Sequence, residues 1–273
     1  MAFGGETAES YYDEGLTASM KGDVTRAIEH FERALQLDNT LTAARHQLGK
    51  CYGRQGETQR AIELFQRVIK EKPGLVPVRV DLGYALLECG RPGDAERVFL
   101  EITHVKPDNS RAQLGLAFCA FDTGRWEEAM HLAQAAVVQG GASFAAFFLL
   151  GRAASLCDRA DIAVESLKRA EAMIEKSIET SPDQPEGYYL RGEVQFAQGN
   201  FAAALDSFRA AEDRSQPHQH YVSYGERFNR VDILARRGVC LQRLDRLADA
   251  REVGRQILGL DPEHKLGRAL SET

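Results

Sequence analysis

A period of 34 residues runs through the sequence, and it restricts the possible folds more than any other feature. Aligning the chain on one alanine places further alanines 34 residues apart, at Ala27, Ala61, Ala95, Ala129 and Ala163. Periods of roughly 20 to 50 residues are typical of arrays in which each repeat stacks only on its neighbours. We therefore expect a stacked repeat protein rather than a fold built around one central core.

The residue types around each alanine indicate a pair of helices. A small residue stands twelve positions earlier, as Gly49 does before Ala61, and two such residues let helices cross closely. A large apolar residue often stands four positions later, as Phe65 does, on the same face of the second helix. A glycine such as Gly56 suits the turn between the helices because it tolerates positive φ. A proline such as Pro73 then ends the second helix.

The register is interrupted twice and returns each time, at Ala204 and again at Ala250. The first interruption predicts that the second helix of the fifth repeat continues through Ile178, until the Ser181-Pro182 pair ends it. The second interruption has apolar residues at helical spacing, which predicts an N-terminal extension of the last repeat's first helix, formed by Tyr221, Tyr224, Phe228 and Val231.

The fourth repeat departs furthest from the pattern. Ala117 replaces the glycine, Ala133 replaces the large apolar residue and Gly140-Gly141 replaces the proline, so we expect a softer joint there. The tail after the last repeat is too short for a full capping helix. The expected boundaries are a lead-in at 1–7, one solenoid domain at 8–264 with repeats at 8–41, 42–75, 76–109, 110–143, 144–184, 185–230 and 231–264, and a tail at 265–273.

This spacing closely resembles the tetratricopeptide repeat family, whose pattern is W-x2-L-G-x2-Y, then A-x3-F, then P. The second repeat carries the pattern at Leu48, Gly49, Tyr52, Ala61, Phe65 and Pro73. The tryptophan of the pattern is replaced by Tyr11, Phe147 and Tyr188 in three repeats. The resemblance implies an all-α solenoid of about seven antiparallel helix-turn-helix repeats, wound into a right-handed superhelix.

The resemblance also implies where a ligand would bind. In this family the first helices line the concave face, and positions two, five, nine and twelve of each repeat point into it. Carried over to this sequence, those positions predict a partner-binding groove formed by Tyr12, His46, Lys50, Tyr84, Leu87, Arg111, Leu114, Phe118, Phe121, Phe148, Arg152, Tyr189 and Phe196. A contiguous aromatic and apolar strip usually marks a partner site. The alternative is that several of these aromatic side chains belong to the core between repeats.

One ligand mode of the family is disfavoured by the residues present. Members that grip the C-terminal carboxylate of chaperone tails carry a lysine at position five and an asparagine at position nine. The first repeat has Tyr12 and Leu16 at those positions, and the second has His46 and Lys50. No three consecutive repeats reproduce the carboxylate clamp.

Composition excludes several other classes of function. The chain of 273 residues has a formal net charge of −6, whereas a general nucleic-acid binder needs a basic face. No segment approaches the 18 or so continuous apolar residues of a membrane span, so we expect no membrane insertion. The N-terminal residues lack the basic and apolar regions of a signal peptide, and the five cysteines form no CxxC motif. These features predict a cytoplasmic protein with reduced thiols.

The residues that carry chemistry form no recognisable cluster. His218-Gln219-His220 is the only close histidine pair and has no neighbouring cysteine or carboxylate cluster, so a solvated loop is the better interpretation. The cysteines recur at equivalent repeat positions, which predicts buried packing roles. We predict no catalytic residues, no metal site and no cofactor, and hence no enzyme. The expected function is a protein-binding adaptor or scaffold in complex assembly or localisation; the alternative is a self-assembling homo-oligomer.

Overall fold

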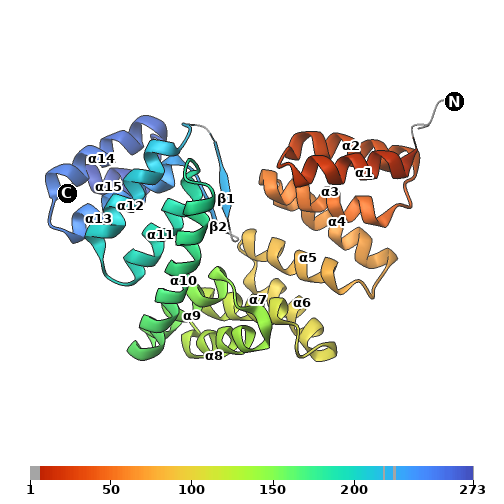
Figure 1. Cartoon of the computed structure of the whole chain (residues 1–273), viewed down its shortest axis with the longest axis horizontal. Coiled ribbons are helices and arrows are strands. Elements are labelled where there is room, and N and C mark those ends of the chain that lie inside the picture. Colours follow the sequence, from red (N-terminus) through yellow and green to blue (C-terminus); the bar gives the residue numbers. More distant parts are fainter. Residues whose placement is uncertain (1–6, 218, 224–225, 273) are drawn as a thin grey trace. The chain divides into compact units, whose positions relative to one another are not determined.

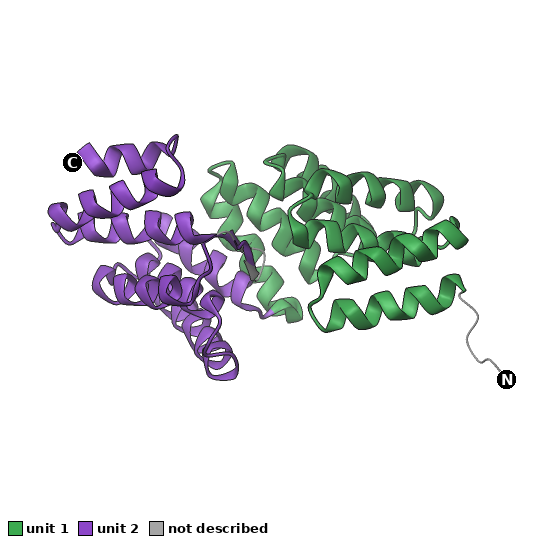
Figure 2. Cartoon of the chain, turned by 90° about the horizontal axis from the view of Figure 1, so that it is seen from above, with its two compact units in different colours: residues 1–141 green, residues 142–273 purple. Residues whose placement is uncertain are grey.

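The structure is a computed structural model that describes residues 7–217, 219–223 and 226–272. In these residues it contains fifteen α-helices, one π-helical turn and one two-stranded sheet (Figure 1). The predicted all-α solenoid is confirmed, because successive helices pack as adjacent hairpins along the chain. The chain forms two compact units, residues 1–141 and 142–273, which are coloured separately in Figure 2.

The first unit is a stack of eight α-helices in which each helix packs on its neighbours in the sequence. It ends in a π-helical turn, η1 (Val137–Gly141), in which Gly140 has a φ of 87°. The division into two units therefore falls at the Gly140-Gly141 pair that distinguishes the fourth repeat. The helices are α1 (Ala8–Met20), α2 (Val24–Leu37), α3 (Thr42–Gln55), α4 (Thr58–Glu71), α5 (Val76–Glu88), α6 (Pro92–Val105), α7 (Ser110–Asp122) and α8 (Trp126–Ala136).

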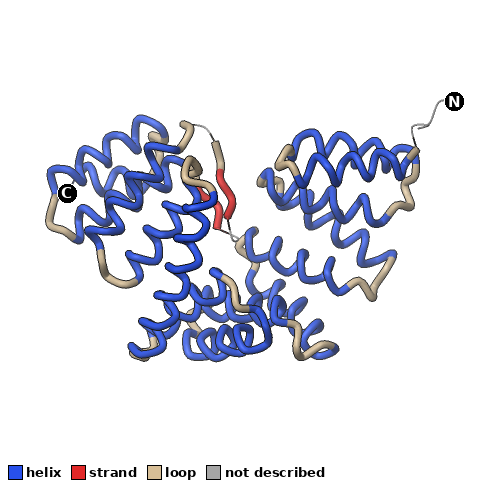
Figure 3. The backbone as a smooth tube through the Cα atoms, in the orientation of Figure 1, coloured by secondary structure: helices blue, strands red, loops and turns tan. Residues whose placement is uncertain are grey.

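The second unit contains seven α-helices and the two strands, which are red in Figure 3. The predicted extension of the fifth repeat's second helix is confirmed, because α10 continues to Thr180. The elements are α9 (Phe144–Leu156), α10 (Ala160–Thr180), α11 (Pro185–Ala197), α12 (Phe201–Arg214), β1 (Tyr221–Ser223), β2 (Glu226–Phe228), α13 (Arg230–Arg243), α14 (Leu247–Leu260) and α15 (Lys265–Glu272).

Steric contact between the two helices of a pair explains why the period couples a glycine to a large apolar residue. A Cβ atom added to Gly83 would lie 2.5 Å from the ring of Phe99, which is closer than carbon atoms can approach. Gly15 and Phe31, Gly49 and Phe65, and Gly192 and Phe208 stand in the same relationship, each at 2.6 Å. The aromatic ring thus packs directly on the backbone of the preceding helix.

The fourth repeat changes both members of this contact together. Ala117 replaces the glycine and Ala133 replaces the phenylalanine, and both side chains are fully buried. The smaller side chain on α8 leaves room for the extra methyl group on α7. The substitution is therefore a compensated change of packing rather than a loss of the core.

The chain between α12 and α13 is a β-hairpin, so the predicted helical extension was wrong. Tyr221 pairs with Phe228 across the two antiparallel strands. Residues seven apart share one face of a helix, but here the same spacing places the two rings on one face of a hairpin. Tyr224 lies outside the described residues.

A capping box fixes the beginning of α13 after the hairpin. The side chain of Asn229 accepts hydrogen bonds from the N–H groups of Val231 and Asp232, and Asp232 accepts one from the N–H of Asn229. These hydrogen bonds satisfy the first backbone N–H groups of α13, which in a longer helix would donate to carbonyl groups of a preceding turn. The helix therefore begins at Arg230 and does not extend toward Tyr221.

The residues after 264 form a short helix that covers the end of the stack, contrary to the expected tail. In the last helical pair Gly254 stands where earlier pairs have a large apolar residue. Leu270 of α15 fills that space, because a Cβ added to Gly238 would lie 2.4 Å from it. Leu270 is fully buried, whereas Arg268 and Glu272 of the same helix are exposed.

Candidate protein-binding surface

Three successive first helices of the first unit, α3, α5 and α7, are joined by one polar cluster. His46 Nε2 lies 2.8 Å from Asp81 Oδ2, within hydrogen-bonding distance. The Arg111 guanidinium donates to Asp81 Oδ1 at 2.9 Å. His46 and Arg111 were both predicted to line the groove, and the structure brings them together through Asp81.

Asp81 is ionised in this cluster at neutral pH. Burial raises the pKa of its carboxyl group, but the hydrogen bonds from His46 and Arg111 outweigh that effect, so the pKa is lowered from 3.8. The carboxylate therefore serves as an internal acceptor that holds two side chains in place. The role of Asp81 was not predicted from the sequence. The sequence does show an acidic residue on α5, the first helix that stands between the helices of His46 and Arg111, and this could have indicated the cluster.

Tyr84 supports Arg111 from the same helix as Asp81. Its hydroxyl group donates to the backbone oxygen of Arg111 at 2.8 Å, and the Arg111 guanidinium carbon lies 5.7 Å from the centre of its ring. Burial raises the pKa of Tyr84, so the hydroxyl group remains a neutral donor. The Arg111 side chain is nevertheless 60% exposed. Its guanidinium is thus oriented by the protein and still accessible to a partner.

Further side chains continue this surface along the same helix faces. Lys50 stands one turn after His46, is exposed, and has no ion-pair partner among the described residues. Leu87 follows Tyr84 by three residues, and two phenylalanines follow Arg111 at helical spacing. We call this set the α3–α5–α7 surface; it consists of His46, Lys50, Asp81, Tyr84, Leu87, Arg111, Phe118 and Phe121.

Three of the predicted groove residues are buried, so predicting them as exposed groove residues was wrong. Leu114, Phe148 and Tyr189 are buried, and the alternative interpretation as core residues describes them. Phe148 stacks on Phe144 with ring centres 5.4 Å apart. The Arg152 guanidinium covers the Phe148 ring at 5.4 Å.

In the second unit the chain itself covers the equivalent positions of α11. The ring of Tyr189 is stacked under Phe228 of the hairpin, with centres 3.9 Å apart. Phe196 is half-buried, with Phe201 at 5.2 Å and the Arg236 guanidinium at 5.6 Å. Glu193, one turn from each of them, pairs with Arg236 at 2.6 Å.

Position five of the repeat shows this difference between the units most directly. Tyr12, His46 and Tyr189 each stand at that position, and each ring lies 5.7–5.9 Å from a phenylalanine of the following helix. Tyr12 and His46 remain partly exposed, whereas Tyr189 is only 7% exposed. The contact within the repeat is thus similar in all three repeats, and at this position the hairpin makes the difference.

The remaining predictions about chemistry have mixed outcomes. Cys51, Cys119 and Cys240 are buried as expected, but Cys89 is exposed at the end of α5 and Cys157 is half-buried. Cys89 was predicted to be buried because its position recurs, but that position lies in a solvated turn. Among the described residues, no group of three His, Cys, Asp or Glu side chains could hold a metal ion. His218 lies outside them, so the histidine pair stays a prediction.

The helical pairs, their glycine-phenylalanine contacts and the surface of first helices define a helical-repeat protein of the α-solenoid class. Models of the tetratricopeptide repeat match residues 8–41, 54–113 and 157–219. The chain belongs to the tetratricopeptide repeat family. No helix in the described part of the chain is long and apolar enough to cross a membrane.

Solved structures with the same fold are similar to this chain at low sequence identity. A tetratricopeptide repeat protein from Parabacteroides merdae is 14% identical, with a TM-score of 0.60 and 98% of each chain covered. PilW, a type IV pilus biogenesis factor, is 18% identical, with a TM-score of 0.59, over 77% of this chain and 94% of PilW. MamA from Desulfovibrio magneticus is 20% identical, with a TM-score of 0.54, over 63% of this chain and 97% of MamA. A search of curated proteins found no significant match.

Proposed function

We propose that the protein is a non-catalytic scaffold that holds a segment of a partner protein on the α3–α5–α7 surface. In this role it assists the assembly or localisation of a larger complex. The observation that carries the proposal is the Arg111 guanidinium, which Asp81 and Tyr84 hold in one orientation while it stays exposed. A pre-oriented and accessible arginine beside aromatic side chains is typical of residues that dominate protein interfaces.

The surface favours a partner segment with both acidic and apolar side chains. The charge of Asp81 is already shared by His46 and Arg111, which leaves Lys50 and the outer donors of Arg111 for a partner. Leu87 and the two phenylalanines of α7 offer apolar contact next to these charges. Such a mixed surface suits an extended or helical protein segment better than a nucleic acid, since the chain is acidic overall.

Charge reversal on this surface tests the proposal. We would compare capture of partner proteins from the native host by the wild-type chain and by the variant Lys50→Glu with Arg111→Glu, identified by mass spectrometry. A matched control reverses two charges on second helices, Lys70→Glu with Arg97→Glu, where both side chains are exposed. Loss of the same partner, by at least about tenfold, only in the first variant supports the proposal. Equal capture by all three chains excludes this surface.

Self-assembly remains the alternative function. The C-terminal end of the stack does not favour it, because α15 buries Leu270 and presents Arg268 and Glu272 to solvent, as capping elements of repeat proteins do. Light scattering over a range of concentrations decides between the two functions, since the molar mass of a single chain at every concentration would exclude self-assembly. A cytoplasmic location is proposed on composition alone.

A further inference from the structure

The connection between α12 and α13 is much longer than its counterparts and is folded against first helices. Helical pairs elsewhere are joined by short turns such as 72–75 and 181–184, whereas this connection spans residues 215–229. Strand β1 contacts α11 and strand β2 contacts α13. The hairpin therefore lies on the side of the second unit that corresponds to the α3–α5–α7 surface of the first.

A stack of aromatic side chains attaches the hairpin to α11. Phe228 is completely buried, and its ring is nearly parallel to that of Tyr189, with an interplanar angle of 11°. The ring of Tyr221 stacks on the ring of Phe228, with centres 5.4 Å apart, and Tyr221 is also buried. The three rings form one stack that a two-stranded segment builds on a helix face.

We infer that the face of α11 and α13 is a binding surface for an extended segment carrying a pair of aromatic side chains, and that the hairpin is its resident occupant. Tyr12 at the equivalent position of α1 makes the same contact with its own repeat and stays partly exposed. The ring at this position can therefore exist without a covering group. The hairpin closes the surface to a partner whose aromatic residues could take the places of Tyr221 and Phe228.

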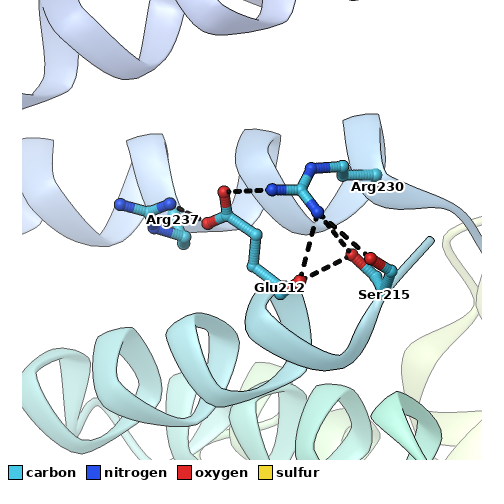
Figure 4. A network of polar contacts seen from close by, with 4 residues as sticks. All are labelled: Glu212, Ser215, Arg230 and Arg237. Carbon is cyan, nitrogen blue, oxygen red and sulfur yellow. Dashed lines mark hydrogen bonds and ion pairs between the residues drawn. The ribbon is translucent and has the colours of Figure 1, made fainter. Parts of the chain in front are cut away.

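A polar network joins α12 to α13 at the ends of the connection (Figure 4). Tyr221 is tied to the same end, because its hydroxyl group accepts a hydrogen bond from the N–H of Gln216 at 2.7 Å. Arg230 donates to the backbone oxygen of Ser215 at 3.1 Å and of Glu212 at 3.3 Å, and pairs with the Glu212 carboxylate at 3.2 Å. Arg237, further along α13, pairs with the same carboxylate. These contacts join α12 to α13 directly. Removal of the aromatic pair is thus expected to release the hairpin while the two helices stay packed.

Tethering gives the hairpin a large advantage over any free segment. A segment joined to its site by short linkers acts at an effective concentration of the order of millimolar. A free peptide of the same sequence therefore competes poorly with the hairpin in the wild-type chain. It gains access when the resident aromatic side chains are removed.

The test titrates a labelled peptide of residues 215–229 into the full chain and follows fluorescence anisotropy. We expect it to bind the variant Tyr221→Ala with Phe228→Ala on the order of 100-fold more tightly than the wild-type chain. A peptide with the same two substitutions should not bind the variant. The control variant Gln219→Ala with His220→Ala changes two exposed residues of the connection before β1 and should resemble the wild type. No binding to a folded double variant, or equal binding to all chains, overturns the inference.

Hydrogen exchange on the wild-type chain keeps the inference testable if the double variant does not fold. An occupant that can be displaced opens locally, so the amides of β1 and β2 should exchange at least about tenfold faster than the core amides of α11 and α13. Exchange of the hairpin only at the rate of global unfolding would show that it is a permanent part of the core. That result overturns the inference without bearing on the α3–α5–α7 surface.

Discussion

The ring of Phe228 lies almost flat on the ring of Tyr189, with centres 3.9 Å apart and an interplanar angle of 11°. Tyr189 stands on a first helix at a repeat position that was predicted to face a ligand, and its covering group comes from the same chain. The two units thus share a repeat pattern but differ in which first-helix side chains are free to meet a partner.

Truncation of the covering ring measures how firmly the hairpin is docked. Phe228→Ala should lower the free energy of unfolding by about 3 kcal/mol, near the low end for a buried phenylalanine, because the hairpin can detach instead of leaving an intact cavity. Urea denaturation followed by circular dichroism checks this. As a control, Val164→Ala shortens a side chain that is 67% exposed, and it should change the free energy of unfolding by less than about 0.5 kcal/mol. Equal effects of both substitutions would contradict the buried stack.

Two glycines of the same repeat are predicted to respond in opposite directions to alanine. A Cβ at Gly83 would meet Phe99 at 2.5 Å, so Gly83→Ala should destabilise the chain by about 1–3 kcal/mol. A Cβ at Gly93, in α6, meets nothing within 4 Å, so Gly93→Ala should stabilise the helix by about 0.5 kcal/mol. Thermal melting of the two variants distinguishes them. A neutral Gly83→Ala would mean that the helices separate at little cost.

The Asp81 cluster predicts a pH-dependent contribution to stability. Folding lowers the pKa of Asp81, so its contribution is present above pH 4 and is lost as the pH falls below 3.8 toward the lowered value. Asp81→Asn should therefore cost about 1–2 kcal/mol at pH 7 and progressively less in acid. Urea midpoints at pH 7, 4 and 3 provide the measurement.

The matched control for Asp81 is a carboxylate that also pairs with an arginine but is open to solvent. Glu101 lies 2.8 Å from Arg79, and its side chain is 66% exposed. Glu101→Gln should therefore cost less than about 0.5 kcal/mol at any of these pH values. A cost for Asp81→Asn that stays constant with pH would show that the carboxylate charge is not what stabilises the cluster.

The cysteines are predicted to react in a defined order. Burial raises the pKa of Cys119 and of Cys240 to about 12, so their thiols are neutral and inaccessible in the folded chain. Alkylation with iodoacetamide at pH 8 should modify exposed Cys89 first and half-buried Cys157 more slowly. Peptide mass spectrometry reads the order. Early modification of Cys119 or Cys240 would indicate that their helices open under native conditions.

Local contacts explain how much of the fold the sequence predicts. Gly83 and Phe99 meet within one helical pair, so a single repeat contains both partners of the contact, and the 34-residue period reports it. The same reasoning predicts the continuation of α10, because a helix depends on neighbours a few residues away. His46 and Arg111 could likewise be placed on first helices from their register alone.

The hairpin shows where such reasoning ends. Tyr221 and Phe228 are separated by seven residues, which places them on one face of a helix and equally opposite each other in a hairpin. The capping box at Asn229 and the stacking of Phe228 on Tyr189 of α11 select the hairpin. The C-terminal residues likewise form a docked helix instead of a free tail because Leu270 fills the space beside Gly238.

By itself, the sequence determined that the chain is an array of helical pairs, because the steric contact within a pair recurs in most of the periods. The tertiary structure decided which of the first-helix residues can meet a partner. Tyr12 and Tyr189 are both tyrosines at the same repeat position, and each contacts a phenylalanine at the equivalent position of the next helix. Yet only Tyr189 is covered. Its covering ring belongs to a distant segment, and the burial of a side chain depends on every segment that reaches it, not on its own repeat.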